Sequence, residues 1–328
     1  MIRRHALAQA LTLAFALGAS IVANTASAQP YPNRTIRIVL GFAPGAITDT
    51  IARAVANQMG KNMGQSVIVD NRAGGGGTIA PDAVARSAPD GYTLLLGESG
   101  GMSVNPLLMA KLSYDVAKDF APIGQVVSLP TILVANASLG TTEVSKLAAI
   151  AVAKGPIPYG SPGPGTSQHL AMEQFRAASG IPLTHVPYRG GALAMNDLLA
   201  GQIPLMVVTV PTVAAQIKAG KIIPLVILGN TRSAVLPDVP TAREAGFASY
   251  SAVSIWQGFF APANTPKEIV TRLNFEIRKA VEAPEVRARL VAVGADIVLN
   301  SPEEFSKVLR DESAILATAI QIAGLKKE

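Results

Sequence analysis

The chain has 328 residues, of which 49% are hydrophobic, and it carries a formal net charge of +6 with no cysteine. The lack of cysteine excludes disulfides, thiol catalysis and lipid attachment at a cysteine, and three histidines without an HExxH motif argue against a zinc site. Lysine and arginine form no cluster typical of nucleic-acid binding, so we expect no nucleic-acid partner, and the length fits about two domains.

The first 28 residues have the three parts of an export signal. Arg3 and Arg4 form a positively charged start, residues 6–22 are apolar, and the sequence ending at Ala28 matches a signal-peptidase site. The apolar run is too short and too rich in alanine for a membrane span. We therefore expect residues 1–28 to be a cleaved signal peptide, and the exported chain to begin at Gln29 without a lipid anchor.

Short strands and helices alternate from residue 35 onward. Apolar residues alternate over 35–40, which is typical of a strand, and they recur every four residues from Ile47 to Met59, which predicts a helix that ends near Gly60. Further predicted elements are a strand over 66–69, a helix over 82–86 and a strand over 92–96. This β-α-β-α-β order implies a parallel sheet with helices on its faces.

The same alternation continues through the middle of the chain. The predicted strands are 131–135, 158–159, 185–186, 205–210 and 224–228, and the predicted helices are 141–153, 167–178, 192–200 and 211–219. Short apolar runs bounded by glycine and proline are typical of buried parallel strands. We therefore predict a second parallel sheet.

The last 75 or so residues are mostly helical by pattern. Thr265-Pro-Lys-Glu268 and Ser301-Pro-Glu-Glu304 are each predicted to be a capping box with proline at the first helical position. A further helix is predicted over 284–293.

Two α/β segments followed by a helical end indicate a two-lobed binding protein with a ligand cleft between the lobes. We expect residues 29–128 together with 254–328 to form the first domain, and residues 129–253 to form the second. In such folds the ligand binds beyond the carboxyl ends of the strands.

Three glycine-rich turns each run straight into a predicted helix, at residues 42–49, 160–167 and 188–192. A helix N-terminus carries free backbone N–H groups and the positive end of the helix dipole, so it attracts anions without a cationic side chain. Glycine lets the backbone approach a ligand closely. Three such turns at one cleft predict a site for a small carboxylate or phosphate.

The candidate ligand contacts lie in these three turns. They are Phe42, Gly45, Ala46, Thr48 and Asp49 in the first, Ser161, Thr166 and Ser167 in the second, and Gly190, Gly191 and Ala192 in the third. For Asp49 the favoured alternative is a carboxylate that stabilises the start of its helix, and the three hydroxyls can act as helix caps and ligand contacts at once. Ile47 is either a core residue or part of the pocket.

His169 lies near two serines, which raises the possibility of Ser–His catalysis. Neither Ser161 nor Ser167 lies in the G-x-S-x-G motif of a nucleophile elbow, and a lone histidine in a helix is more often structural. We therefore expect a binding protein with no catalytic residue, metal or cofactor.

Motifs along nearly the whole exported chain carry a family resemblance. They include Tyr31-Pro-x-Arg34, Phe42-x-Pro-Gly45, Thr48-Asp-x-x-Ala-Arg53, Asn71-Arg-x-Gly-Gly-Gly-Gly77, Pro89-Asp-Gly-Tyr-Thr93, Gly165-Thr-Ser-x-His-Leu170, Val186-Pro-Tyr-Arg-Gly-Gly191 and Trp256-x-Gly258. With these motifs the chain resembles the Bug family, the periplasmic solute receptors of tripartite tricarboxylate transporters. It departs from the family at Ala46, where members usually have a second glycine.

The resemblance implies a periplasmic-binding-protein-like fold of two α/β domains that close on a ligand. It implies as ligand a dicarboxylate, tricarboxylate, acidic amino acid or aromatic carboxylate, held by loop amides and water. It also implies a monomer in the periplasm that delivers its ligand to membrane permease subunits. The alternative is a receptor that reports ligand occupancy to a sensor partner.

Overall fold

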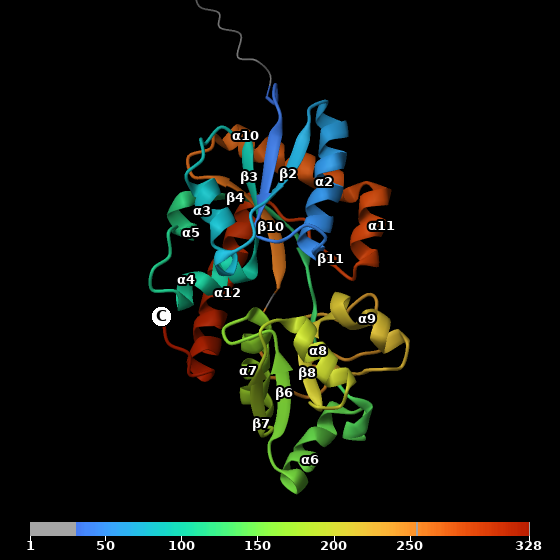
Figure 1. Ribbon diagram of the computed structural model, residues 1–328. Coiled ribbons are helices and arrows are strands. Elements are labelled where there is room, and N and C mark those ends of the chain that lie inside the picture. The colour runs from blue at the N-terminus through green and yellow to red at the C-terminus, as the bar shows by residue number, and fades with distance from the viewer. Residues whose placement is uncertain (1–30, 254, 328) are drawn as a thin grey trace, which may run out of the picture. The chain divides into compact units, whose positions relative to one another are not determined.

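The computed structural model describes residues 31–253 and 255–327, and the expected signal peptide lies outside the described residues. Residues 34–328 contain two β-sheets (Figure 1). Within the described ranges, no helix is long and apolar enough to cross a bilayer.

The first sheet has six strands in the order β11-β4-β10-β3-β1-β2. Their bounds are β1 Ile36–Leu40, β2 Val67–Asn71, β3 Thr93–Glu98, β4 Phe120–Ser128, β10 Trp256–Pro262 and β11 Asp296–Ile297. Strand β1 pairs in parallel with β2 and β3, which confirms the predicted parallel β-α-β-α-β unit. Strand β10 is antiparallel to both β3 and β4, so the complete sheet is mixed.

The second sheet has five strands in the order β7-β6-β8-β5-β9. Their bounds are β5 Thr131–Ala135, β6 Ile157–Ser161, β7 Leu183–Pro187, β8 Leu205–Thr209 and β9 Ile223–Ile227. Strand β6 is parallel to β7 and β8, but β5 is antiparallel to β8 and β9. The prediction of an all-parallel second sheet was therefore wrong. A continuous apolar run indicates that both faces of a strand are buried, but it does not indicate the direction of the strand.

Eleven labelled helices surround the two sheets in the described part of the chain (Figure 1). They are α2 Ile47–Met63, α3 Ile79–Ala85, α4 Asn105–Leu108, α5 Val116–Asp119, α6 Leu147–Lys154, α7 Ser167–Ser179, α8 Gly191–Leu199, α9 Val210–Lys218, α10 Lys267–Glu282, α11 Pro284–Ala292 and α12 Pro302–Ile322. We call the six-stranded sheet with its helices the first lobe, and the five-stranded sheet with its helices the second lobe. The chain passes to the second lobe between β4 and β5, and it returns between β9 and β10.

Helix α2 runs one turn further than predicted. It ends at Met63, and the C-cap residue Gly64 has a φ of 65° and donates its N–H to the Gly60 carbonyl. Gly60 stays within the helix, where a Cβ would lie 3.1 Å from the carbonyl oxygen of Gln65. Glycine at position 60 therefore lets the chain at Gln65 pass close to the helix, and it does not end the helix.

Both faces of the second sheet are buried, and β5 shows how. Leu133 and Ala135 belong to an apolar cluster that also includes residues of α6 and α7. Ile132 and Val134 belong to a second cluster, with residues of α8 and α9. Alternate residues of a strand point to opposite faces, so β5 is a central layer between two pairs of helices.

The first lobe has an aromatic core beside the crossing back from the second lobe. Trp256 and Phe260 of β10 pack against Phe305 of α12, with ring centroids 5.2 and 5.1 Å from that of Phe305. Further along α12, Leu316 and Ala319 belong to the second lobe's core. Helix α12 therefore contributes to the packing of both lobes.

Only one of the two predicted capping boxes forms. Ser301 caps α12: its hydroxyl accepts the N–H of Glu304 at 3.1 Å, and the Glu304 carboxylate accepts the N–H of Ser301 at 2.7 Å. At α10 the prediction was wrong. The Thr265 hydroxyl donates to the Pro262 carbonyl, and the N-cap residue of the helix is Pro266.

Replacing Ser301 with alanine is expected to lower the free energy of unfolding by about 1 kcal/mol, because the Glu304 N–H loses the hydroxyl that accepts its hydrogen bond. Ser306→Ala in the same helix is the matched control, since that hydroxyl only bonds back to the Pro302 carbonyl. Urea denaturation of the three proteins measures the difference. Equal effects of the two substitutions would contradict a capping role for Ser301.

Candidate functional site

A cavity of about 540 Å³ is lined by residues of both lobes. Its walls are Phe42, Ala46, Ile47, Thr48, Glu98, Gly100, Val104, Asn105, Leu129, Pro164, Gly165, Thr166, Ser167, Gln168, Thr209, Ile255, Trp256 and Gln257. The size suits a small organic molecule. A depression of about 700 Å³ along α2 and β2 is lined by the first lobe alone and includes none of the three glycine-rich turns.

The first turn brings the start of α2 to the cavity. Ala46 is the N-cap residue, with a φ of −65° and ψ of 162°, so an alanine fits there without strain. Gly45 before it has a φ of 87°, which favours glycine. Ile47 and Thr48 follow on the cavity wall, and the N–H groups of a first helical turn have no partner within the helix.

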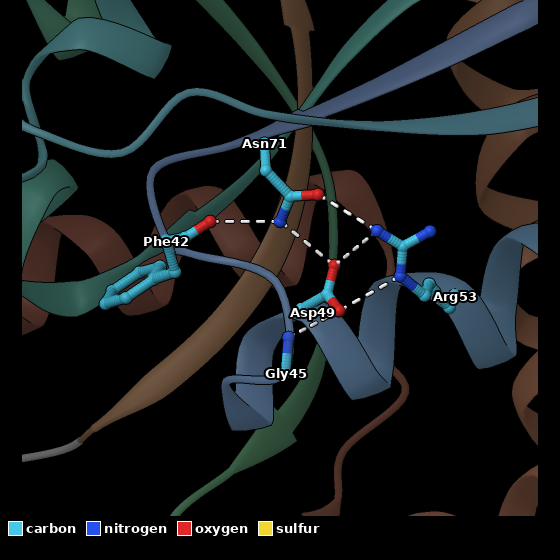
Figure 2. A network of polar contacts seen from close by, with 5 residues as sticks. All are labelled: Phe42, Gly45, Asp49, Arg53 and Asn71. Atoms are coloured by element: carbon cyan, nitrogen blue, oxygen red, sulfur yellow. Dashed lines mark hydrogen bonds and ion pairs between the residues drawn. The ribbon is translucent and has the colours of Figure 1, made fainter.

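Hydrogen bonds to the Asp49 carboxylate fix the conformation of this turn (Figure 2). The carboxylate accepts the N–H of Gly45 at 2.9 Å, the Nδ2 of Asn71 at 2.9 Å and the Nε of Arg53 at 3.0 Å. Asn71 also donates to the Phe42 carbonyl at 3.0 Å, which ties both ends of the turn to β2. The Arg53 guanidinium is the main cause that lowers the pKa of Asp49 to about 2.

The Asp49 carboxylate is thus engaged within the protein, and Asp49 is not among the residues that line the cavity. These contacts favour the helix-start interpretation of Asp49. Its direct contact with a ligand stays a prediction.

The second turn brings the start of α7 to the cavity from the other lobe. Thr166 caps this helix: its hydroxyl accepts the N–H of His169 at 3.3 Å and donates to the Gly163 carbonyl at 2.8 Å. Ser167 lies 3.4 Å from Ser99 of the first lobe, measured between the two hydroxyl oxygens. The two lobes therefore meet at the edge of the cavity through a pair of serines.

Ser161 lies beneath the second turn and is fully buried. Its hydroxyl lies 2.7 Å from the Nε2 of His185, whose ring stacks on that of His169 with centroids 4.0 Å apart. Burial lowers the pKa of His169 to about 4 and also lowers the pKa of His185, so both rings are neutral at pH 7. Ser161 is buried and His185 is partly buried, and neither residue lines the cavity, so the pair supports the turn and is not a catalytic pair.

The third turn lies against the second. Gly190 donates its N–H to the Pro162 carbonyl at 3.0 Å and precedes α8. Gly190, Gly191 and Ala192 are not among the cavity-lining residues. Of the three predicted helix starts, two therefore meet at the cavity, and ligand contact by the third stays a prediction.

The structure adds cavity residues that sequence reasoning missed. Glu98 and Gln257 are the main ones: β3 ends at Glu98, and Gln257 follows Trp256 in β10. The Nε2 of Gln257 donates to the Thr48 hydroxyl at 2.7 Å. The position of Glu98 at the carboxyl end of a predicted strand was a signal that could have found it, whereas Gln257 has no sequence signal.

Trp256 connects the cavity wall to α12. Its Nε1 donates to the Glu312 carboxylate at 2.6 Å, and Ser103 donates to the same carboxylate oxygen at 2.8 Å. The other oxygen, Oε1, is buried without a partner in the described structure. Burial raises the pKa of Glu312 to about 7, although both donors oppose the shift.

The arrangement defines a class of protein. Two α/β lobes contribute to one cavity, and helices α2 and α7 begin at it from different lobes. No cationic side chain is among the described residues of its wall. These are the features of a two-lobed solute-binding protein.

Comparison with known proteins gives the family. Residues 51–325 match the tripartite tricarboxylate transporter family receptor, TctC. The protein BugT of Bordetella pertussis is 35% identical over 307 residues, which are 93% of this chain and 94% of BugT. The chain therefore belongs to the TctC family of tripartite tricarboxylate transporter receptors.

Solved structures agree with this assignment. A Rhodopseudomonas palustris protein with adipate is 32% identical with a TM-score of 0.79, and the match covers 91% of this chain and 100% of that one. MatC of the same organism, with bound malate, is 31% identical with a TM-score of 0.73, covering 88% and 100%. The expected family and the two-lobed fold class are confirmed, and the protein is a solute-binding receptor and not an enzyme.

Proposed function

We propose that this protein is a periplasmic receptor that captures a small organic carboxylate in the cavity between its lobes. It then delivers the ligand to the membrane permease of a tripartite tricarboxylate transporter. The observation that carries the proposal is the meeting of two helix N-termini, α2 and α7, at one cavity without a cationic side chain in its described wall.

The physical argument for a carboxylate rests on those two helix starts. Each carries about half a positive charge and several N–H donors directed out of the helix end. An anion between them receives hydrogen bonds from both lobes, so it binds the closed arrangement more tightly than either lobe alone and shifts the protein toward closure. The adipate and malate bound by two relatives are small acids of this kind.

We place the first domain at 29–128 with 254–328 and the second at 129–253, so that both crossings lie at the cavity beside Leu129 and Ile255. Residues 1–28 would direct export and be removed after Ala28. We propose that the exported receptor acts as a monomer, because one chain supplies both walls of the cavity.

A thermal-shift panel of organic acids tests this function. Adipate, malate, succinate, citrate, glutarate, benzoate, L-aspartate and L-glutamate each belong to a ligand class named above. A ligand that binds only the folded state raises the apparent unfolding free energy by roughly 2.7 kcal/mol at a hundredfold excess over its Kd. We expect at least one acid to give a saturable rise in Tm. Cooperative melting with no shift for any acid, from protein freed of co-purified ligand by refolding, would contradict the proposal.

A further inference from the structure

Glu98 places a carboxylate on the wall of a cavity that otherwise suits an anion. It is the last residue of β3, and each of its oxygens accepts one backbone N–H at 2.7 Å, from Gly100 to Oε2 and from Gly101 to Oε1. A carboxylate has about four acceptor positions, so both oxygens can still accept a donor from a ligand. Burial raises the pKa of Glu98 above its usual range, and the two N–H bonds oppose this shift and fix the carboxyl group in place.

Gln257 adds a second acceptor to the same wall. The residue is 3% exposed, and its amide nitrogen is engaged by the Thr48 hydroxyl at 2.7 Å. Its Oε1 is buried and has no hydrogen-bond partner within the described structure. A buried amide oxygen without a donor is costly, and a ligand that brings a donor relieves this cost.

The charges of the cavity then discriminate among organic acids. Among the described lining residues, Glu98 is the only one with an ionisable side chain. A second ligand carboxylate near an ionised Glu98 meets a like charge and is repelled. An ammonium group there is attracted to the carboxylate, favours the charged form of Glu98 and supplies three N–H donors.

We propose that the ligand is a zwitterionic amino acid, whose carboxylate lies at the starts of α2 and α7 and whose ammonium group is accepted by Glu98 and Gln257. This inference rests on the proposed function and narrows its substrate class. Glu98 is then the residue that selects an amino-bearing acid over a simple dicarboxylate.

Matched pairs of ligands test the inference on the unaltered protein. Calorimetric titration at pH 7.5 compares succinate with L-aspartate, glutarate with L-glutamate, and butanoate with 4-aminobutanoate. In any pair of which at least one compound binds, we expect the amino compound to bind at least tenfold more tightly than its amino-free partner. If the amino-free acid binds equally or more tightly, the receptor function stands and the zwitterion inference is overturned. If none of the six compounds binds, the zwitterion inference is overturned, and the wider thermal-shift panel decides the receptor function separately.

The variant Glu98→Gln then assigns the preference to one side chain. We expect the variant to reduce the affinity for the amino compound, relative to that for the amino-free acid, at least tenfold. The amino-free acid should bind the variant as well as it binds the wild type, or better. Glu276→Gln is the control for charge and burial, because Glu276 is a buried carboxylate on α10, paired with Arg272 and outside the cavity. An unchanged ratio in Glu98→Gln would overturn the role of Glu98. Should that variant fail to fold, the ligand pairs on the unaltered protein still decide the substrate class.

Discussion

Replacing Ala46 with aspartate is expected to weaken organic-acid binding at least hundredfold and to leave the fold as stable as before. Ala46 is the N-cap of α2 and lines the cavity. Aspartate is a preferred N-cap residue, so the helix gains a cap in place of a residue with no capping side chain. The same carboxylate places a negative charge where we expect the ligand's carboxylate, and a like charge at about 4 Å costs about 4 kcal/mol at an effective dielectric constant of 20.

The matched control is Ala46→Asn, because asparagine has the same shape and caps helices equally well without a charge. Calorimetric titration of the strongest-binding acid into both variants separates charge from shape, and Tm reports the fold. We expect the aspartate variant to bind at least tenfold more weakly than the asparagine variant, with similar Tm values. Equal affinities would show that no ligand carboxylate lies near the start of α2.

Glu312 is expected to make the protein less stable as the pH rises from about 4.5 to about 7. Burial raises the pKa of this carboxyl to about 7 in the folded protein, from its ordinary value of 4.5. The folded state therefore holds a proton that the unfolded state has released. The unfolding free energy contributed by this group is fully present below the lower value and is lost by up to about 1.4 kcal/mol per pH unit, roughly 3 kcal/mol in all, as the pH rises through the interval.

Urea unfolding of the wild type and Glu312→Gln between pH 4 and 8 measures this contribution. The variant keeps an acceptor for Trp256 and Ser103 but cannot titrate, so its stability relative to the wild type is expected to rise with pH. The wild type and the variant must be compared because His169 has the opposite effect on stability. Its pKa is lowered to about 4 in the folded protein, so the stability that it contributes is lost as the pH falls from about 6.5. Glu303→Gln, an exposed site on the same helix, controls for the charge change. A difference between wild type and Glu312→Gln that does not vary with pH would contradict a titrating Glu312.

Sequence reasoning predicted the fold well where the pattern itself carries the information. Alternating apolar residues at 35–40 and the capping box at Ser301 are local signals, and both elements form as expected. The direction of β5 has no local signal. All five of its residues are buried, and its orientation depends on pairing with β8 and β9, which lie 70 or more residues away in the chain.

The residues of the candidate site likewise divide into those with a local sequence signal and those without one. Ala46 and Thr166 were predicted because glycine before a helix is visible in the sequence, and both line the cavity. Gln257 was missed because it reaches the site only through the return of the chain from the second lobe, and its partner Thr48 is 209 residues away. Ser161 has the residue type of a ligand contact, but the fold buries it against His185.

A crystal structure of the protein with its strongest-binding organic acid would locate the ligand carboxylate. We expect it in the cavity between the lobes, with its oxygens about 3 Å from backbone nitrogens at the starts of α2 and α7. A carboxylate held instead by arginine or lysine side chains, or a ligand in the depression along α2 and β2, would contradict this expectation.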